Sequence, residues 1–139
     1  MRAQIEHSLA QPGLMRTLNV TLLEVSAGSV TLELPIGEAV SQQNGFVHAG
    51  AIAALLDSAC GFAALSVMPE GSDVLAVEFK INLVAPTVGV ALRAVAEVVK
   101  AGRTITVCRG EAFAVGADGA LKLVAVMQGT MIRVDQSTP

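Results

Sequence analysis

The chain has 139 residues, of which 53% are hydrophobic, 15% charged and 3% aromatic, and its formal net charge is −3. This length predicts one domain over residues 1–139, and the hydrophobic content excludes a disordered chain. Because the net charge is negative and the chain has neither Tyr nor Trp, nucleic-acid binding is disfavoured.

The cysteines and the N-terminal residues indicate the expected cellular location of the protein. Cys60 and Cys108 lie far apart, at no spacing typical of a disulfide framework or a metal site, which favours a cytoplasmic location. No signal peptide is recognised near the N-terminus, and no run of about 18 apolar residues predicts a membrane span. With only His7 and His48 available, no metal site is expected. A chain with so few charges is expected to associate with a second copy of itself.

A short helix and a hairpin are predicted before residue 36. Residues 3–15 fit an amphipathic helix that ends around Pro12-Gly13. Residues 18–25 and 29–35 alternate between apolar and polar side chains on either side of Ala27-Gly28, which is typical of a hairpin.

The longest predicted helix runs from about Ala49 to Val67 and is apolar on two opposite faces. One face has the spacing of a core-facing stripe and consists of Ile52, Leu55, Leu56, Ala59, Phe62 and Ala63. The other face surrounds Asp57 and consists of Ala53, Ala54, Cys60, Gly61 and Ala64. A helix that is apolar on all sides is expected to be buried on all sides. We expect a sheet to cover the first face, and a second subunit or a ligand to lie against the second.

An antiparallel meander is predicted after this helix. Alternation begins near Val74 and stops at Pro86, with Val77, Phe79, Ile81 and Leu83 on one face and Glu78, Lys80 and Asn82 on the other. Three further strands are predicted over residues 90–100, 104–115 and 121–134. The glycines of the two turns between them, at residues 101–102 and 117–119, suit a positive φ.

Asp57 is the single charged residue of the predicted helix. A carboxylate buried without a partner is destabilising when ionised, so burial raises its pKa and makes it a usable base. Asp57 could instead cap or pair within the fold, but its apolar surroundings favour the functional interpretation. A serine hydrolase is disfavoured, because no nucleophile-elbow motif is present and Ser58 lies inside the helix.

The polar segment from residue 41 to residue 50 leads into this helix. Backbone N–H groups at a helix start lack partners and carry the positive end of the helix dipole. Ala49 and Gly50 have little or no side chain, so a carbonyl oxygen could approach these donors as in an oxyanion hole. Taken alone, His48 indicates a helix cap more often than a catalyst, and Gln42 and Asn44 first indicate a turn.

The segment from Asn44 to Gly61, NGFVHAGAIAALLDSACG, closely resembles the hotdog-fold acyl-CoA thioesterases of the phenylacetate-degradation (PaaI-type) subfamily. Residues 77–86, Gly89 and residues 100–104 are similar to the family's third strand, its proline turn and its fourth-to-fifth strand turn. The likeness covers roughly residues 15–134. It implies an α+β hotdog fold, in which a curved antiparallel sheet of five or six strands wraps a long central helix. It also implies a homodimer with active sites at the interface, paired into a homotetramer.

This resemblance implies hydrolysis of an acyl-CoA or aryl-acyl-CoA thioester to a free acid and CoA, with CoA as part of the substrate and no separate cofactor. Asp57 is then the general base or the nucleophile, and the backbone N–H of Ala49, at the helix start with Gly50, is the oxyanion donor. Gln42 orients the water or the thioester, and His48 holds the loop and supports the carbonyl site. An alternative is a non-catalytic acyl-CoA sensor or carrier, which would not need Asp57. A hydratase or dehydratase ranks last, because its motif is not found.

Four further positions are expected to contact the substrate. Asn44 and Gly61 lie within the resembling segment, and Lys100 and Arg103 are plausible contacts for the CoA phosphates. The charges of Lys100 and Arg103 are explained equally well by solvation at a hairpin tip.

Two features depart from the commonest family pattern. The usual His-Gly-Gly is His48-Ala49-Gly50 here, and the added methyl group narrows the approach of a carbonyl. A hydroxyl residue that some members place on the third strand falls at Ala76, where Ser58 or Ser72 could substitute for it.

Overall fold

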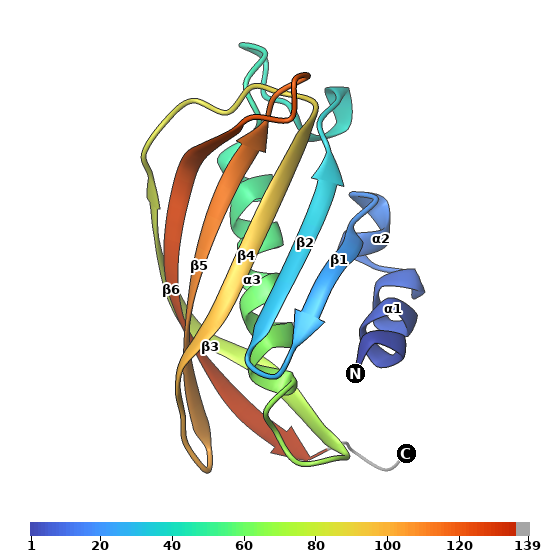
Figure 1. Cartoon of the computed structure of the whole chain (residues 1–139), viewed down its shortest axis with the longest axis vertical. Helices are drawn as coiled ribbons and strands as arrows, with labels where there is room; N and C mark the ends of the chain where they lie inside the picture. Colours follow the sequence, from blue (N-terminus) through green and yellow to red (C-terminus); the bar gives the residue numbers. More distant parts are fainter. Residues whose placement is uncertain (136–139) are drawn as a thin grey trace.

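Within residues 1–135, which the computed structural model describes, six antiparallel strands form one sheet that curves around a long helix (Figure 1). The strands are β1 (Thr21–Ser26), β2 (Ser29–Pro35), β3 (Ser72–Leu83), β4 (Ala91–Ala101), β5 (Ile105–Val115) and β6 (Leu121–Asp135). The helices are α1 (Arg2–Ala10), α2 (Leu14–Thr17) and α3 (Ala49–Leu65), with a 3-10 turn, η1 (Glu38–Val40), before α3.

The strands are ordered β1-β2-β4-β5-β6-β3 across the sheet. Hairpins join β1 to β2, β4 to β5 and β5 to β6, and in each pair the strands are antiparallel. The chain leaves β2, passes through α3, and returns along β3 at the far edge, where β3 pairs with β6. This arrangement confirms the predicted α+β architecture, in which an antiparallel sheet wraps a long helix.

Helix α3 lies across the concave side of the sheet and contacts β2 to β6. The predicted core stripe is confirmed for five residues that are buried: Ile52, Leu55, Leu56, Ala59 and Ala63. The prediction is wrong for Phe62, which is only half-buried, because it points away from the sheet. Cys60 and Ala64, predicted on the second face, are fully buried in the core. The buried stripe is therefore wider than the sequence indicates, and the open face is narrower.

The close approach of α3 to the sheet depends on Gly110 of β5. A Cβ on Gly110 would lie 2.9 Å from Cδ2 of Leu56 and 3.3 Å from Sγ of Cys60. Neighbouring inward positions carry alanines that are also fully buried, among them Ala94, Ala96 and Ala112. These small side chains let the helix backbone come near the strands while the interior stays densely packed. Much of the high alanine content is explained in this way.

The N-terminal segment contains the predicted short helix, α1, which stops before Pro12-Gly13, and a second short helix, α2, that was not predicted. The chain is extended after Ala10, and Gly13 then caps α2. Pro12 lacks a backbone N–H and cannot continue the hydrogen bonds of α1. Asn19, with φ +56°, turns the chain after α2, and β1 therefore begins three residues later than predicted.

The two edges of the sheet are covered differently. At β1, Ile5 and Leu9 of α1 are buried, and Nη2 of Arg2 donates a hydrogen bond to the Leu23 carbonyl oxygen at 3.0 Å. At β3, no described element covers the edge, and apolar side chains are 42–59% exposed: Leu75, Val77, Phe79 and Leu83. An exposed apolar edge strand is a site where another chain can pair. The available edge is therefore that of β3.

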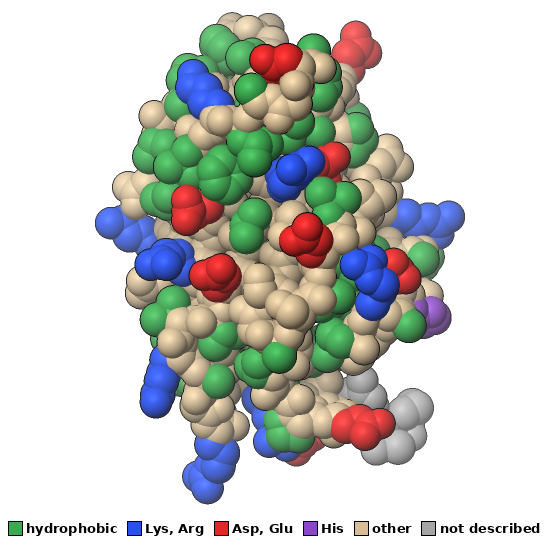
Figure 2. All heavy atoms as spheres, in the orientation of Figure 1, with side chains coloured by type: hydrophobic (Ala, Val, Ile, Leu, Met, Phe, Trp, Pro, Cys, Tyr) green, Lys and Arg blue, Asp and Glu red, His purple; other side chains and the backbone are tan. Residues whose placement is uncertain are grey.

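The outer face of the sheet carries acidic and basic side chains spread among apolar and neutral ones (Figure 2). Glu33 of β2 and Arg93 of β4 lie opposite each other and form an ion pair at 2.8 Å. The Thr130 hydroxyl of β6 donates a hydrogen bond to the Glu78 carboxylate of β3. Such cross-strand pairs stabilise the solvent side of a sheet by small amounts each.

One of the two predicted turns contains its glycine for a reason other than a positive φ. Gly119 has φ +83°, as predicted for residues 117–119. Gly102 does not have a positive φ, so that prediction is wrong. A Cβ on Gly102 would lie 2.7 Å from the Ile105 carbonyl oxygen, so the glycine is required by a close backbone approach instead.

No helix within residues 1–135 has both the length and the apolar character to cross a membrane.

We predict that Gly110→Val destabilises the fold by roughly 1–3 kcal/mol, because the added methyl groups would overlap Leu56 and Cys60. Urea denaturation of the variant and of the parent protein, at equal concentration, measures the change. Gly37→Val is the control, because no heavy atom lies within 4 Å of a Cβ at that position and its backbone is extended. Equal losses in the two variants would contradict the role given to Gly110.

Candidate functional site

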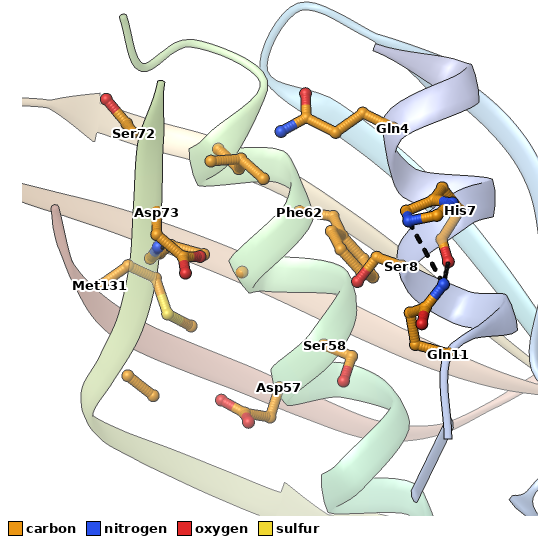
Figure 3. A pocket seen from close by; sticks show the side chains of 14 residues that line it. Gln4, His7, Ser8, Gln11, Asp57, Ser58, Phe62, Ser72, Asp73 and Met131 are labelled. Carbon is orange, nitrogen blue, oxygen red and sulfur yellow. Dashed lines mark hydrogen bonds between the residues drawn. The ribbon is translucent and has the colours of Figure 1, made fainter. Parts of the chain in front are cut away.

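Asp57 lies in a cavity between α1, α3 and β3 (Figure 3). The cavity has a volume of about 470 Å³, which falls in the range of sites for small ligands. In Figure 3, α3 stands between β3 and α1, and the Asp57 carboxyl points to the β3 side. Gly61, Phe62 and Leu65 continue the α3 surface along the cavity, and Val74 and Ala76 of β3 form part of the opposite wall.

The Asp57 carboxyl group is held in an unfavourable environment for its charge. Its Oδ1 atom is buried and has no hydrogen-bond partner among residues 1–135. Burial raises the pKa of Asp57 above the ordinary value of 3.8, because the ionised form loses its hydration. The interpretation that Asp57 merely caps or pairs within the fold is therefore wrong for the single chain. A cavity-lining carboxyl with a raised pKa is a typical candidate for acid–base chemistry.

Residues of α1 also line this cavity, and the sequence analysis did not identify them. Gln4, His7 and Ser8 lie on one face of α1, and Gln11, the residue that follows the helix, continues their i, i+3, i+4, i+7 spacing. That spacing was visible in the sequence as a polar stripe. What the sequence could not show is that α1 packs beside the open face of α3.

The start of α3 is capped by His48. Nδ1 of His48 accepts a hydrogen bond from the Gly50 N–H at 2.8 Å, so the N–H of Gly50 is occupied. The Ala49 N–H has no acceptor among residues 1–135, which leaves it free for a substrate oxygen. A Cβ on Gly50 would lie 2.9 Å from Nδ1 of His48, so glycine makes room for the cap. Of the two predicted oxyanion donors, the geometry therefore favours the Ala49 N–H, because the Gly50 N–H is occupied.

Gln42 and Asn44 belong to a tight turn, as expected. The Gln42 N–H donates to the Phe46 carbonyl at 2.8 Å, and the Gly45 N–H donates to the Gln42 carbonyl at 3.0 Å. The turn is tied to the segment after β3, because the Val47 N–H donates to the Thr87 carbonyl at 3.1 Å. Gln42 and Ala49 line a second cavity of about 410 Å³, together with residues 83–87. Asn44 is exposed and lines neither cavity.

The predicted catalytic residues do not meet within one chain. Asp57 lines the first cavity, whereas Gln42 and Ala49 line the second. Eight residues of α3 separate Ala49 from Asp57, which corresponds to about 12 Å along a helix axis. A reacting carbonyl must lie about 3 Å from both the oxyanion donor and the attacking group. Within one chain, the predicted oxyanion donor and the predicted attacking group are therefore too far apart to act on the same carbonyl.

The remaining predicted positions are placed as follows. Gly61 lines the Asp57 cavity, and so do Ser58 and Ser72, the two hydroxyl residues considered as substitutes at Ala76. Ser72 lies four residues before Ala76 on β3, about 13 Å along a strand, so it cannot occupy the same place.

The hairpin tip that holds Lys100 and Arg103 lies at the end of the sheet opposite to the start of α3 (Figure 1). Neither residue lines either cavity. Within one chain these two cations are thus remote from Ala49 and Asp57, and their contact with CoA phosphates stays a prediction.

Cys60 and Cys108 are free thiols in the core. Burial raises the pKa of Cys60 to about 12 and that of Cys108 to about 11, so neither is a ready nucleophile at neutral pH. Cys108 Sγ approaches the Cys60 carbonyl oxygen at 3.4 Å. Among residues 1–135, no three His, Cys, Asp or Glu side chains are grouped so as to hold a metal ion.

Comparisons with known proteins place the chain in a family. Residues 44–118 match the Thioesterase superfamily. A thioesterase family protein from Silicibacter pomeroyi is 41% identical, with a TM-score of 0.91 over 97% of this chain and 99% of that one. A Bacillus halodurans protein solved with CoA is 33% identical, with a TM-score of 0.68 over 75% of this chain and 66% of that one. A Halobacterium salinarum protein with a provisional esterase name is 31% identical over 110 residues, 76% of this chain and 72% of that protein.

The chain belongs to the thioesterase superfamily, whose members hydrolyse thioesters, because the family match covers more than half of its length. The structural match over nearly the whole chain confirms the predicted hotdog fold. These comparisons identify the superfamily and not the PaaI-type branch within it, which stays a prediction.

We predict that Asp57→Asn raises the stability of the protein at neutral pH. The raised pKa means that ionisation of Asp57 opposes folding. The free energy of unfolding of the parent protein therefore falls as pH rises from 3.8 through the raised pKa. The asparagine variant has no such loss. Urea midpoints of both proteins, measured at equal concentration from about pH 4 to pH 8, should diverge as pH rises. A gap that narrows with rising pH would mean that the carboxylate is stabilised in the fold.

Proposed function

We propose that this chain is an acyl-CoA thioesterase that works as a homodimer with two active sites, each built from both subunits. The observation that carries the proposal is the buried Oδ1 of Asp57, which has no partner in the described part of the chain and lies in a cavity on the open face of α3. A protein that only binds acyl-CoA gains nothing from an unpaired carboxyl group at this place.

The exposed edge of β3 supports the dimer. Its uncovered apolar side chains would be buried if β3 of one subunit paired with β3 of a second. Such pairing would bring the Ala49 end of one α3 towards the middle of the other, where Asp57 lies. The two separated halves of the site would then complete each other. Further pairing of dimers into a tetramer follows only from the resemblance to PaaI-type enzymes, to which we assign the chain on its residues 44–61.

In this site, the thioester carbonyl oxygen accepts a hydrogen bond from the Ala49 N–H of one subunit. The dipole of α3 stabilises the negative charge that develops on the oxygen. His48 holds this end of the helix in shape through its hydrogen bond with the Gly50 N–H. The side chain of Gln42, at the same end, orients the attacking water or the thioester.

Asp57 of the other subunit activates the attack in one of two ways. As a general base it takes a proton from water, whose oxygen bonds to the carbonyl carbon as the carbon–sulfur bond breaks. As a nucleophile it bonds to the carbon itself, and water then hydrolyses the resulting anhydride. In both cases the CoA thiolate leaves and takes up a proton, and the products are a carboxylic acid and CoA. Both routes require the ionised carboxylate.

The CoA-bound Bacillus halodurans protein supports CoA as the thiol part of the substrate. The two free thiols of this chain suit the reducing cytoplasm, where CoA esters occur, and we propose that location.

We predict that Asp57→Asn lowers kcat/KM for acyl-CoA hydrolysis by about 10²–10⁴, because an amide can neither take up a proton nor attack. Release of free CoA from a panel of short-chain, long-chain and aryl acyl-CoAs, detected with a thiol reagent, measures the rate. Asp118→Asn is the matched control, since Asp118 lies in the β5–β6 turn, where its carboxylate accepts a hydrogen bond from the Ala120 N–H, and lines neither cavity. Near-parental hydrolysis by Asp57→Asn would refute the assignment. In the parent protein, kcat/KM should fall as the pH is lowered through a pKa above 3.8, because both routes require the ionised carboxylate.

A further inference from the structure

The polar stripe of α1 has no part in the chemistry proposed above, yet it forms a wall of the Asp57 cavity. The helix is held in place by its other face, where Ile5 and Leu9 are buried. The exposed face of a surface helix is commonly charged. The stripe consists instead of four polar side chains, none of them Lys, Arg, Asp or Glu: Gln4, His7, Ser8 and Gln11.

Hydrogen bonds within α1 leave donors and acceptors directed at the cavity. Nε2 of Gln11 lies 3.2 Å from Nε2 of His7 and 3.4 Å from the His7 carbonyl oxygen. An amide NH2 group can only donate, so Nε2 of His7 is the acceptor in this contact. The side-chain oxygen of Gln11 and the side-chain polar groups of Gln4 and Ser8 have no hydrogen-bond partner within residues 1–135.

The middle of the cavity is apolar and lies between Asp57 and this stripe (Figure 3). Gly61 leaves the floor open, because only Val74, at 3.9 Å, would contact a Cβ placed there. The half-buried ring of Phe62 lies between α3 and α1. A helix is about 10 Å wide with its side chains, so an acyl chain of medium length that starts near Asp57 can reach α1.

The charges around the cavity are of one sign. Asp57 and Asp73 both line it, and no Lys or Arg is among its lining residues in the described part of the chain. A carboxylate at the far end of an acyl chain would be repelled by Asp57 and Asp73. A hydroxyl group would find hydrogen-bonding partners on the stripe.

We infer that the stripe of Gln4, His7, Ser8 and Gln11 determines acyl specificity, favouring a neutral hydrogen-bonding group at the end remote from the thioester and excluding a carboxylate there. This inference rests on the proposed thioesterase function. It assigns His7 and Gln11 to substrate selection, whereas Asp57 and Ala49 carry out the reaction.

The test uses three CoA thioesters of equal chain length: octanoyl-CoA, 8-hydroxyoctanoyl-CoA and suberoyl-CoA, which ends in a carboxylate. The parent protein should prefer the hydroxylated chain to octanoyl-CoA by about three- to tenfold in kcat/KM, the value of one or two neutral hydrogen bonds. It should hydrolyse suberoyl-CoA at least about tenfold less efficiently than octanoyl-CoA. The double variant His7→Leu, Gln11→Leu should bring the hydroxyl preference close to one.

Two further variants complete the test. Gln11→Arg should raise the efficiency for suberoyl-CoA relative to octanoyl-CoA by about tenfold or more, because it adds a cation to the stripe. Ala10→Gln, on α1 but outside the cavity, should leave every ratio as in the parent. If the esters are hydrolysed but the His7 and Gln11 variants leave the kcat/KM ratios between them unchanged, this inference is overturned and the thioesterase proposal is not. Failure of the parent to hydrolyse any of the three esters or any other acyl-CoA would overturn the thioesterase proposal itself.

Discussion

The close packing of α3 against the concave side of the sheet determines where everything else lies. Gly110 and the buried alanines bring the helix near the strands, so five consecutive strands cover one side of it. The sheet cannot also cover the other side, and there Asp57 stays half-buried without a partner. The helix that forms the core therefore also presents the Asp57 carboxyl group to the cavity. A looser or more polar contact with the sheet would not hold that group in position.

The same helix explains why a single chain is incomplete. Its N-terminus offers a free N–H at Ala49, and its middle offers a carboxyl group at Asp57, but the helical rise keeps the two apart. In the proposed dimer, a second copy that pairs along β3 would bury the exposed apolar edge and would bring Ala49 of one subunit towards Asp57 of the other. Stability and catalysis would then depend on the same interface. Enzymes often accept local instability of this kind at functional sites.

Sequence reasoning predicted most of the elements and named the candidate site residues, but it did not predict their surroundings. Helix α3, the strands after it and the cap at His48 follow from periodicity and local hydrogen bonding, which act over a few residues. The place of β3 beside β6 and the packing of α1 beside α3 depend on contacts between distant segments. This is why the cavity wall at His7 and Gln11 was missed, and why Phe62 was assigned to the core. The glycine at 102 was predicted correctly as a turn residue, but for the wrong reason, because the carbonyl of Ile105 is a tertiary contact.

The claim that each active site combines residues of two subunits is tested most directly by mixing two inactive variants. Asp57→Asn lacks the carboxylate and Gln42→Ala lacks the amide at the other half of the site, so either homodimer alone should be impaired. When the two are refolded together, half of the dimers are hybrids that each contain one intact site, and about a quarter of parental activity should return. A mixture no more active than the average of its components would contradict the account, because it would place both residues in a site made by one chain.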